Sequence, residues 1–408
     1  MRRPGGVVDY DRVLPRLVRK SDTRILFLVL DGLGGLPHPE SGLTEMETAN
    51  TPNLDALARR SSCGLHDPVL PGITPGSGPG HLGIFGYDPT RIEVGRGVLA
   101  ACGIGFPLEP GDVAARINFC TLDERGIVTD RRAGRIPTEQ NRTLTRILES
   151  IDLGDVRLFV RAVKEHRAVL VLRGEGLDAA LEDTDPQRTG VPPLQARARQ
   201  PEAEKTAALV NRFVERAREA LGAHAPANGI LLRGFDSPAG IPSFGERYGL
   251  RAAAIAAYPM YRGLARLVGM DVIETGETLE AEVESLEKVR GDFDFFFVHY
   301  KPTDSRGEDG DFLAKARALE ALDLQLPRML NLGFEVVVVT GDHSTPSSLR
   351  SHSWHPVPFL LHSPWCVAGV TLAFSERAVR SGMEGRIPAR ALIPLALAHA
   401  RRLEKYGA

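Results

Sequence analysis

Three short apolar segments that each lead to an aspartate are the feature that most constrains the fold of this chain. They are residues 25–30 before Asp31, residues 293–298 before Asp304, and residues 336–339 before Asp342. Continuous β-branched and aromatic runs of this length are typical of parallel strands that are buried on both faces. We therefore predict an α/β fold with a doubly wound, mostly parallel sheet.

The position of these aspartates indicates a site. In doubly wound sheets, ligands bind just outside the carboxyl ends of the strands. Three carboxylates at one such edge would repel each other strongly unless cations lay between them. The alternative is that three unrelated aspartates cap the helices that follow the strands. The pattern thus predicts either a metal site or three separate helix caps.

Composition argues against several classes of protein, among them nucleic-acid-binding, disulfide-rich and membrane-spanning ones. The 408 residues are 43% hydrophobic and 25% charged, which is ordinary for a globular protein, and the net charge of −2 favours neither nucleic acid nor an anionic membrane as a partner. The four cysteines lie far apart without C-x-x-C spacing, which argues against a disulfide framework. Residues 1–22 contain no apolar stretch typical of a signal peptide, and no apolar run is long enough to span a bilayer. We expect a cytoplasmic protein.

The pattern changes in the middle of the chain. Between residues 112 and 226, short alternating segments predict an antiparallel or mixed sheet. The sequence therefore predicts a discontinuous core domain, 1–111 plus 227–408, interrupted by a smaller α+β domain, 112–226. Within these domains we expect a helix capped by Thr51, with Pro52 in its first turn, and a helix over about 203–221.

Further candidate metal ligands lie close to the aspartates in the sequence. His343 directly follows Asp342, Glu308 lies four residues after Asp304, and His352 lies nine residues after His343. Aspartate and histidine without a thiolate suit Mn²⁺, Zn²⁺ or a similar divalent ion. Two such ions, a few ångströms apart, stabilise the attacking and leaving oxygens in phosphoryl transfer.

The stretch 71–82 offers a nucleophile. Ser77 stands alone among glycines and prolines, in a loop that would allow close approach to a phosphate. The alternative is an ordinary solvent-exposed loop. A Ser-His-Asp hydrolase is disfavoured because G-x-S-x-G is absent, with Pro75 at the first glycine position, and no P-loop motif occurs.

Several longer motifs point to one family. They are residues 30–35, 49–53, 80–82, 85–89, 95–97, 129–135, 166–169, 301–304 and 341–346. In this order, the motifs closely resemble those of the cofactor-independent phosphoglycerate mutases of the archaeal type, within the alkaline phosphatase superfamily. The resemblance runs over nearly the whole chain.

The resemblance implies the roles of the candidate residues. Ser77 would be the phosphorylated nucleophile. One metal ion would be held by Asp31, Ser77, Asp342 and His343, and a second by Asp304, His352 and the residue at position 308. The two cofactors would be divalent ions, with Mn²⁺ the first choice and Mg²⁺, Co²⁺ or Zn²⁺ as alternatives.

This chain departs from the family pattern at two places. Glu308 stands where the family usually has histidine, so we expect either a site with harder metal preference or a ligand role for the neighbouring Asp309. Gly78 follows the serine where archaeal relatives often carry an acidic residue.

The resemblance also implies a substrate-binding role for the inserted domain. Phosphoglycerate is a trianion, and guanidinium groups bind phosphate and carboxylate in a bidentate manner. The candidate residues are Arg131, Arg132, Arg135, His166 and Arg167 in this domain and Arg233 and Arg262 in the core domain.

The expected function is therefore a mutase that interconverts 2-phosphoglycerate and 3-phosphoglycerate in glycolysis and gluconeogenesis through a phosphoserine. The alternatives are a metal-dependent phosphatase, a homoserine kinase-like phosphotransferase on the same fold, or an inactive binding protein with an impaired second metal site. A monomer or a small homo-oligomer is expected.

Overall fold

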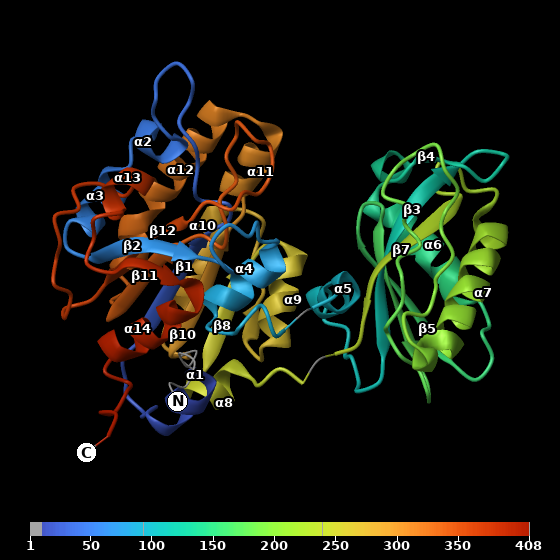
Figure 1. The fold of residues 1–408 in the computed structure, drawn as a ribbon, viewed down its shortest axis with the longest axis horizontal. Helices are drawn as coiled ribbons and strands as arrows, with labels where there is room; N and C mark the ends of the chain where they lie inside the picture. The colour runs from blue at the N-terminus through green and yellow to red at the C-terminus, as the bar shows by residue number, and fades with distance from the viewer. Residues whose placement is uncertain (1–9, 93, 239, 408) are drawn as a thin grey trace, which may run out of the picture. The chain divides into compact units, whose positions relative to one another are not determined.

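The structure is a computed structural model that describes residues 10–92, 94–238 and 240–407. Residues 1–9, part of the stretch in which no signal peptide is predicted, lie outside the described residues. The chain forms two compact units, one of residues 1–93 and 241–408 and the other of residues 94–240. In Figure 1, the first unit carries the blue and the yellow-to-red parts of the chain and the second unit the green middle.

The boundaries of the second unit lie further out than those we predicted. The segments 94–111 and 227–240, which the sequence analysis assigns to the core, belong to this unit because they pack on its central strand, β3 (Val113–Leu122). Helix α5 (Arg96–Gly103) approaches β3 so closely that a Cβ on Gly97 would lie 2.2 Å from the Ala114 carbonyl oxygen. Strand β7 (Gly229–Asp236) pairs antiparallel with β3.

An eight-stranded sheet forms the centre of the first unit. Its order is β13 (Gly385–Pro388), β2 (Ser62–Asp67), β12 (Val357–His362), β11 (Val336–Thr340), β1 (Ile25–Leu30), β10 (Phe295–Tyr300), β8 (Ala252–Ala256) and β9 (Asp271–Ile273). Only β12 runs against the other strands of the described residues. The predicted mostly parallel α/β sheet is confirmed, and the three apolar runs are its adjacent central strands.

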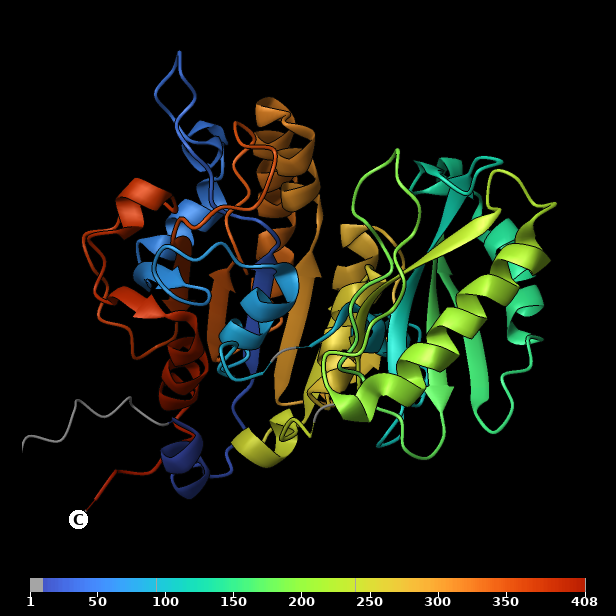
Figure 2. The same ribbon diagram turned by 45° about the vertical axis from the view of Figure 1, so that its right-hand side comes forward.

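Helices cover this sheet on both faces (Figure 2). They are α1 (Tyr10–Val13), α2 (Glu45–Thr48), α3 (Pro52–Ala58), α4 (Ser77–Ile84), α8 (Phe244–Tyr248), α9 (Pro259–Leu267), α10 (Leu279–Val289), α11 (Pro302–Asp309), α12 (Phe312–Leu330), α13 (Glu376–Val379) and α14 (Leu392–His399), with 3₁₀ turns at Leu14–Arg16 and Ala389–Ala391. No described helix is both long and apolar enough to cross a membrane.

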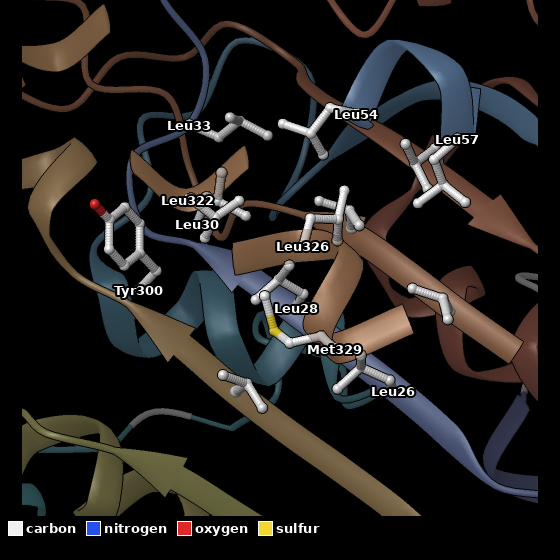
Figure 3. Close-up of a cluster of buried hydrophobic side chains, with 14 of the residues drawn as sticks. Leu26, Leu28, Leu30, Leu33, Leu54, Leu57, Tyr300, Leu322, Leu326 and Met329 are labelled. Carbon is white, nitrogen blue, oxygen red and sulfur yellow. The ribbon is translucent and has the colours of Figure 1, made fainter. Parts of the chain in front are cut away.

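The apolar residues of β1 divide between two cores. Leu26, Leu28 and Leu30 face one side, where they pack with residues of α3 and α12 such as Leu326 (Figure 3). Phe27 faces the other side and lies 5.0 Å from Phe295, ring centre to ring centre. Because both faces are covered, every position of the strand favours an apolar side chain, which explains the continuous run.

The second unit is built on a five-stranded antiparallel sheet. It comprises β3, β4 (Val128–Asp130), β5 (Arg157–Lys164), β6 (Arg167–Arg173) and β7. Helices α6 (Thr138–Glu149) and α7 (Glu204–Leu221) contribute to the apolar core on one face, and 3₁₀ turns occur at Ala133–Arg135 and Pro201–Ala203. The predicted helix near 203–221 corresponds to α7.

The start of α3 corrects one local expectation. Thr51 occupies the N-cap position, with Pro52 in the first turn as predicted, but its side chain accepts no capping hydrogen bond. The buried carboxylate of Asp323 in α12 accepts instead from the backbone N–H groups of Asn53, at 3.2 Å, and Leu54, at 2.7 Å. A partner from a distant helix thus satisfies donors that a local cap usually satisfies.

Replacing this carboxylate gives a test of the packing between α3 and α12. Asp323→Ala leaves two buried backbone donors without an acceptor, so we expect the free energy of unfolding of the first unit to fall by about 2–4 kcal/mol. Urea unfolding measures the change. Leu324→Ala on the same helix removes a side chain that is 77% exposed and should change stability by less than about 0.5 kcal/mol. Equal stability of both variants would contradict the capping role.

Candidate metal centre

The three predicted aspartates meet at the carboxyl edge of the sheet. Strand β1 lies between β10 and β11 in parallel register, so the residues that follow these strands are brought together. Asp31 directly follows β1, Asp342 lies two residues after β11, and Asp304 lies in the first turn of α11 behind β10. All three side chains are buried. The alternative of three separate helix caps does not describe this cluster.

Two overlapping groups of side chains have metal-ligand geometry. One is Asp31, Asp342 and His343, and the other is Asp304, His343 and His352; in each group the ligand atoms lie within 4.8 Å of one another. His343 belongs to both, with its Nε2 3.3 Å from Asp31 Oδ1 and 3.2 Å from Asp342 Oδ2, and its Nδ1 4.0 Å from Asp304 Oδ1.

The hydrogen bonds to Asp31 are strongly asymmetric. Its Oδ2 accepts from the Tyr261 hydroxyl, from His299 Nε2 at 3.1 Å and from Lys301 Nζ at 3.0 Å. Among the described residues, no hydrogen bond reaches its Oδ1, although this atom is buried. Burial alone would raise the pKa of Asp31, but the charge of Lys301 and the neighbouring His299 and His343 hold it well below its usual value. The result is an ionised carboxylate with one oxygen available to a cation.

Asp342 repeats this arrangement. Its Oδ1 accepts from the Gly32 backbone N–H at 3.2 Å, whereas its buried Oδ2 accepts no hydrogen bond from the described residues. His81 Nδ1 lies 3.1 Å from that oxygen but is directed to the Ser77 carbonyl oxygen, 2.8 Å away. Two buried carboxylate oxygens without donors, both next to the His343 imidazole, fit a divalent cation.

The charge preference of the site agrees with this interpretation. Burial lowers the pKa of His343, but the charges of Asp342, Asp31 and Asp304 outweigh it and raise the pKa to about 9. The three carboxylates therefore favour positive charge where His343 lies, and a bound divalent ion would meet the same demand while leaving the imidazole neutral as a ligand.

The second group is closer to solvent. Asp304 Oδ1 accepts from the Thr345 hydroxyl at 2.6 Å, and Asp304 Oδ2 accepts from Lys301 Nζ at 2.5 Å. His352 directs its Nδ1 to the Pro75 carbonyl oxygen, at 2.9 Å, so its Nε2 faces Asp304 Oδ1 at 3.7 Å. A carbonyl partner on one ring nitrogen is the usual way to orient a histidine ligand.

Glu308 lies beside this second group but is less tightly placed. Its Oε1 is 3.9 Å from His352 Nε2, and its side chain is 55% exposed. The alternative ligand, Asp309, forms an exposed ion pair with Arg306, at 3.3 Å, on the same helix. Of the two neighbouring carboxylates, Glu308 is the one that lies within reach of His352.

Ser77 lies at the same edge. It is the first residue of α4, and its Oγ is 3.5 Å from His343 Nε2. Close packing of α4 against the ligand loop requires glycine at position 80, because a Cβ there would lie 2.3 Å from the Asp342 carbonyl oxygen. The glycine-rich stretch therefore brings the candidate nucleophile to the metal ligands and is not an ordinary exposed loop.

The second unit carries most of the predicted substrate-binding residues. On β3, the even-numbered positions lie on the face opposite α6 and α7, because the odd-numbered ones belong to the core shared with these helices. Arg116 of this face is opposite Arg233 on β7, and Asn118 is opposite Arg167 on β6. Burial lowers the pKa of Arg96 in α5, and the nearby Arg233 and Arg167 lower it further.

A second set of cations surrounds the buried His166. Burial lowers the pKa of this histidine to about 4, and the charges of Arg167, Arg132, Arg135 and Arg116 contribute to the shift. His166 Nδ1 is buried without a hydrogen bond to any described residue. The imidazole is thus neutral at pH 7 and is surrounded by positive charge that favours an anion.

Two predicted arginines have other partners. Arg131 forms a bidentate ion pair with the buried Asp185, with its Nε 2.9 Å from Oδ1 and its Nη2 2.7 Å from Oδ2. Arg262 follows Tyr261 on α9 in the first unit, and its guanidinium binds Glu274. Each of these two guanidinium groups is therefore bound to a carboxylate of its own unit.

The sequence analysis missed several groups of the site. Lys301, Tyr261, His299 and His81 surround the ligand carboxylates, and Arg116 extends the arginine face. Lys301 lies in the motif 301–304, three residues before Asp304, and alternation along residues 113–119 would have identified Arg116. Tyr261 has no comparable local signal, because it reaches the site from a helix that follows a different strand.

Fold and site together define an α/β protein in which a serine lies beside two groups of carboxylate and imidazole ligands at the carboxyl edge of a mostly parallel sheet. The sequence model of the family described as 2,3-bisphosphoglycerate-independent phosphoglycerate mutase matches residues 58–228. A relative from Aquifex aeolicus and one from Thermus thermophilus, each named "probable 2,3-bisphosphoglycerate-independent phosphoglycerate mutase", are 50% identical over 97% and 98% of this chain and over their full length.

Solved structures agree with these relatives. A cofactor-independent phosphoglycerate mutase from Thermoplasma acidophilum is 30% identical, with a TM-score of 0.71 over 93% of this chain and 100% of that chain. A protein from Pyrococcus horikoshii is 31% identical, with a TM-score of 0.83 over 95% of this chain and 100% of its own. This chain belongs to the family of 2,3-bisphosphoglycerate-independent phosphoglycerate mutases. The predicted family is confirmed, the chain is an enzyme of the isomerase class, and the phosphatase and homoserine kinase-like alternatives are not favoured.

Proposed function

We propose that this chain interconverts 2-phosphoglycerate and 3-phosphoglycerate by passing the phosphoryl group through Ser77. The observation that carries the proposal is the position of the Ser77 oxygen, 3.5 Å from His343 Nε2 and next to both groups of metal ligands. The Ser77 hydroxyl gives up its proton and its oxygen attacks phosphorus as the bond to the glycerate oxygen breaks; the leaving glycerate oxygen takes up a proton. The other glycerate hydroxyl then loses its proton and attacks the phosphoserine, and the Ser77 oxygen leaves and takes up a proton.

Two divalent ions, with Mn²⁺ the first candidate, complete this site in the proposal. Asp31, Ser77, Asp342 and His343 would hold one ion, and Asp304, Glu308 and His352 would hold the other. When bound, such ions neutralise the charge on the phosphoryl oxygens and lower the pKa of the attacking hydroxyl. Because His343 also faces Asp304, it adjoins both groups.

This chain's own residues prepare the site. Lys301 and Tyr261 each donate to Asp31 Oδ2 and so fix the orientation of its carboxylate. Burial raises the pKa of Tyr261 well above its usual value, and the neighbouring Asp31 and Asp342 raise it further, so its hydroxyl remains a donor at pH 7. The arginines around His166 would bind the carboxylate or phosphate of the substrate in a bidentate manner.

The proposed substrates and the cysteines together indicate a cellular compartment. Phosphoglycerates are small molecules of glycolysis and gluconeogenesis, and the four free cysteines suit a reducing compartment, so we place the enzyme in the cytoplasm as a monomer or small homo-oligomer.

Ser77→Ala tests the covalent route. Alanine offers no oxygen to carry the phosphoryl group, so the turnover of metal-loaded enzyme should fall by at least about 10³-fold while the fold is retained. A coupled assay that consumes 2-phosphoglycerate measures this turnover. Ser351→Ala, at an exposed serine in the loop before His352, should keep wild-type turnover. Mutase activity above a few per cent in Ser77→Ala would rule out the phosphoserine route.

Paired arginine variants test the role of the second unit. Arg135→Ala removes an exposed guanidinium near His166, so the KM should rise by about 10- to 100-fold, with little change in stability. Arg131→Ala leaves the buried Asp185 without its bidentate partner and should lower the free energy of unfolding by up to about 3 kcal/mol. Steady-state kinetics and urea unfolding of both variants separate the roles. Unchanged kinetics of Arg135→Ala would refute its contact with substrate.

Glu308→His tests the second metal ion, with Asp309→His as the matched control. If Glu308 is a ligand, imidazole should shift the preference of this site from Mn²⁺ or Mg²⁺ toward Zn²⁺ or Co²⁺ and preserve or raise mutase activity. Asp309 pairs with Arg306, so its replacement should leave the metal profile unchanged. Competition of the metal-free protein with a chromogenic chelator measures each affinity. An identical profile for wild type and Glu308→His would show that Glu308 is not a ligand.

A further inference from the structure

Lys315 is a fully buried lysine that hydrogen-bonds to carbonyl oxygens. It lies in the first turn of α12, and its Nζ donates to the carbonyl oxygens of Gly32, at 2.8 Å, Gly34, at 2.9 Å, and Thr345, at 2.8 Å. A lysine ammonium has three donors, and all three are used. None of the hydrogen bonds goes to a carboxylate, so Lys315 is not one half of a simple buried ion pair.

The three carbonyl groups belong to the two loops that carry the candidate metal ligands. Gly32 and Gly34 follow Asp31 after β1, and Thr345 lies two residues after His343 behind β11. The Thr345 backbone N–H also donates to the Gly32 and Gly34 carbonyl oxygens, at 3.2 and 3.1 Å. Lys315 therefore links the loop after β1 to the loop after β11 at positions beyond the ends of both strands.

Thr345 extends this connection to both ligand groups. Its hydroxyl donates to Asp304 Oδ1 at 2.6 Å and lies 3.0 Å from His343 Nδ1. A displacement of the Thr345 backbone would therefore change the position of one carboxylate and one imidazole ligand together. Lys315 holds the carbonyl group of this residue.

Two glutamates, the buried Glu45 and the partly buried Glu376, also hydrogen-bond to these loops. Glu376 accepts from the Gly35 backbone N–H at 2.7 Å, and Glu45 accepts from the backbone N–H and hydroxyl of Ser347, at 2.8 and 2.7 Å. Burial lowers the pKa of Lys315, and the charges of Glu45 and Glu376 act against that shift. The two carboxylates thus favour the charged form of Lys315.

The buried Lys315 and Glu45 are costly compared with apolar side chains of the same volume. The surrounding core already stabilises α12 through Leu319, Leu322 and Leu326, so the packing of this helix does not require a lysine. The contacts of Lys315 and the two glutamates go to the ligand loops. The free-energy cost of burying these charged groups is best explained if the ligand loops must be held in a fixed arrangement.

We propose that Lys315, with Glu45 and Glu376, is a positioning group that sets the separation between Asp31 and His343 and thereby the affinity of the site for its divalent ions. The inference rests on the proposed metal site. It predicts that removing the ammonium weakens metal binding more than does a substitution elsewhere on the same helix that lowers stability by a comparable amount.

Calorimetric titration of the metal-free, full-length protein with Mn²⁺ is the test. Lys315→Met keeps the length of the side chain but removes the ammonium donor from all three carbonyl groups, of which those of Gly32 and Gly34 keep only the Thr345 N–H, so Mn²⁺ affinity should fall by about 10- to 100-fold. Glu376→Gln keeps an acceptor for Gly35 but removes a charge beside Lys315, and it should lower the affinity by about three- to tenfold. The KM for phosphoglycerate at saturating Mn²⁺ should change less than the metal affinity.

Leu326→Ala is the matched control. This fully buried residue lies on the same helix, and its truncation should cost about 2–5 kcal/mol of stability while Mn²⁺ affinity stays within twofold of wild type. Affinities of Lys315→Met and Glu376→Gln that are also within twofold of wild type would overturn the positioning role. If Lys315→Met does not fold, Glu376→Gln decides by the same criterion. A wild-type protein that binds no Mn²⁺ would instead overturn the proposed metal site, and this inference with it.

Discussion

Mutual repulsion between buried carboxylates is the constraint on which the rest of this structure depends. Ligand oxygens of Asp31 and Asp342 lie within 4.8 Å of each other, and the pair is fully buried. Two like charges about 4 Å apart repel by about 4 kcal/mol even at an effective dielectric constant of about 20. The protein offsets this repulsion with fixed donors on one oxygen of each carboxylate, chiefly Lys301 and Tyr261 on Asp31 and the Gly32 backbone on Asp342. The other oxygens have no hydrogen-bond donor among the described residues, so they are available to a cation.

The same constraint explains why small residues surround the site. Ligands from three strands and α4 come together only if their backbones approach closely, and a side chain at Gly32 would collide with Thr345 and Asp304. Gly32 also has a φ of +63°, a conformation that other residues adopt only at a cost. The motifs that carry the resemblance are therefore rich in glycine for a steric reason: these glycines lie where ligand loops touch one another.

Sequence predicted the central strands and the meeting of their three aspartates well, because both follow from local patterns. Continuous apolar runs identified β1, β10 and β11, and parallel pairing then brought Asp31, Asp304 and Asp342 to one edge. What sequence did not predict depends on distant contacts. Asp323 replaces Thr51 as the partner of the α3 donors, Asp185 engages Arg131, and α5 joins the second unit through its packing on β3. Nothing within a few residues of these positions indicates such partners.

The position of Glu308 shows where a metal site of this kind tolerates change. At His343, a carboxylate would add a fourth negative charge to a fully buried cluster that already contains three. Glu308, by contrast, is 55% exposed, and its Oε1 lies 3.9 Å from His352 Nε2. Solvent screens much of the extra charge there, so replacing imidazole with carboxylate costs little stability and acts mainly on the choice of metal. We therefore expect substitutions that change the metal preference at the exposed edge of the second group. In the buried first group, which adjoins Ser77, we expect the ligand residues to tolerate no such change.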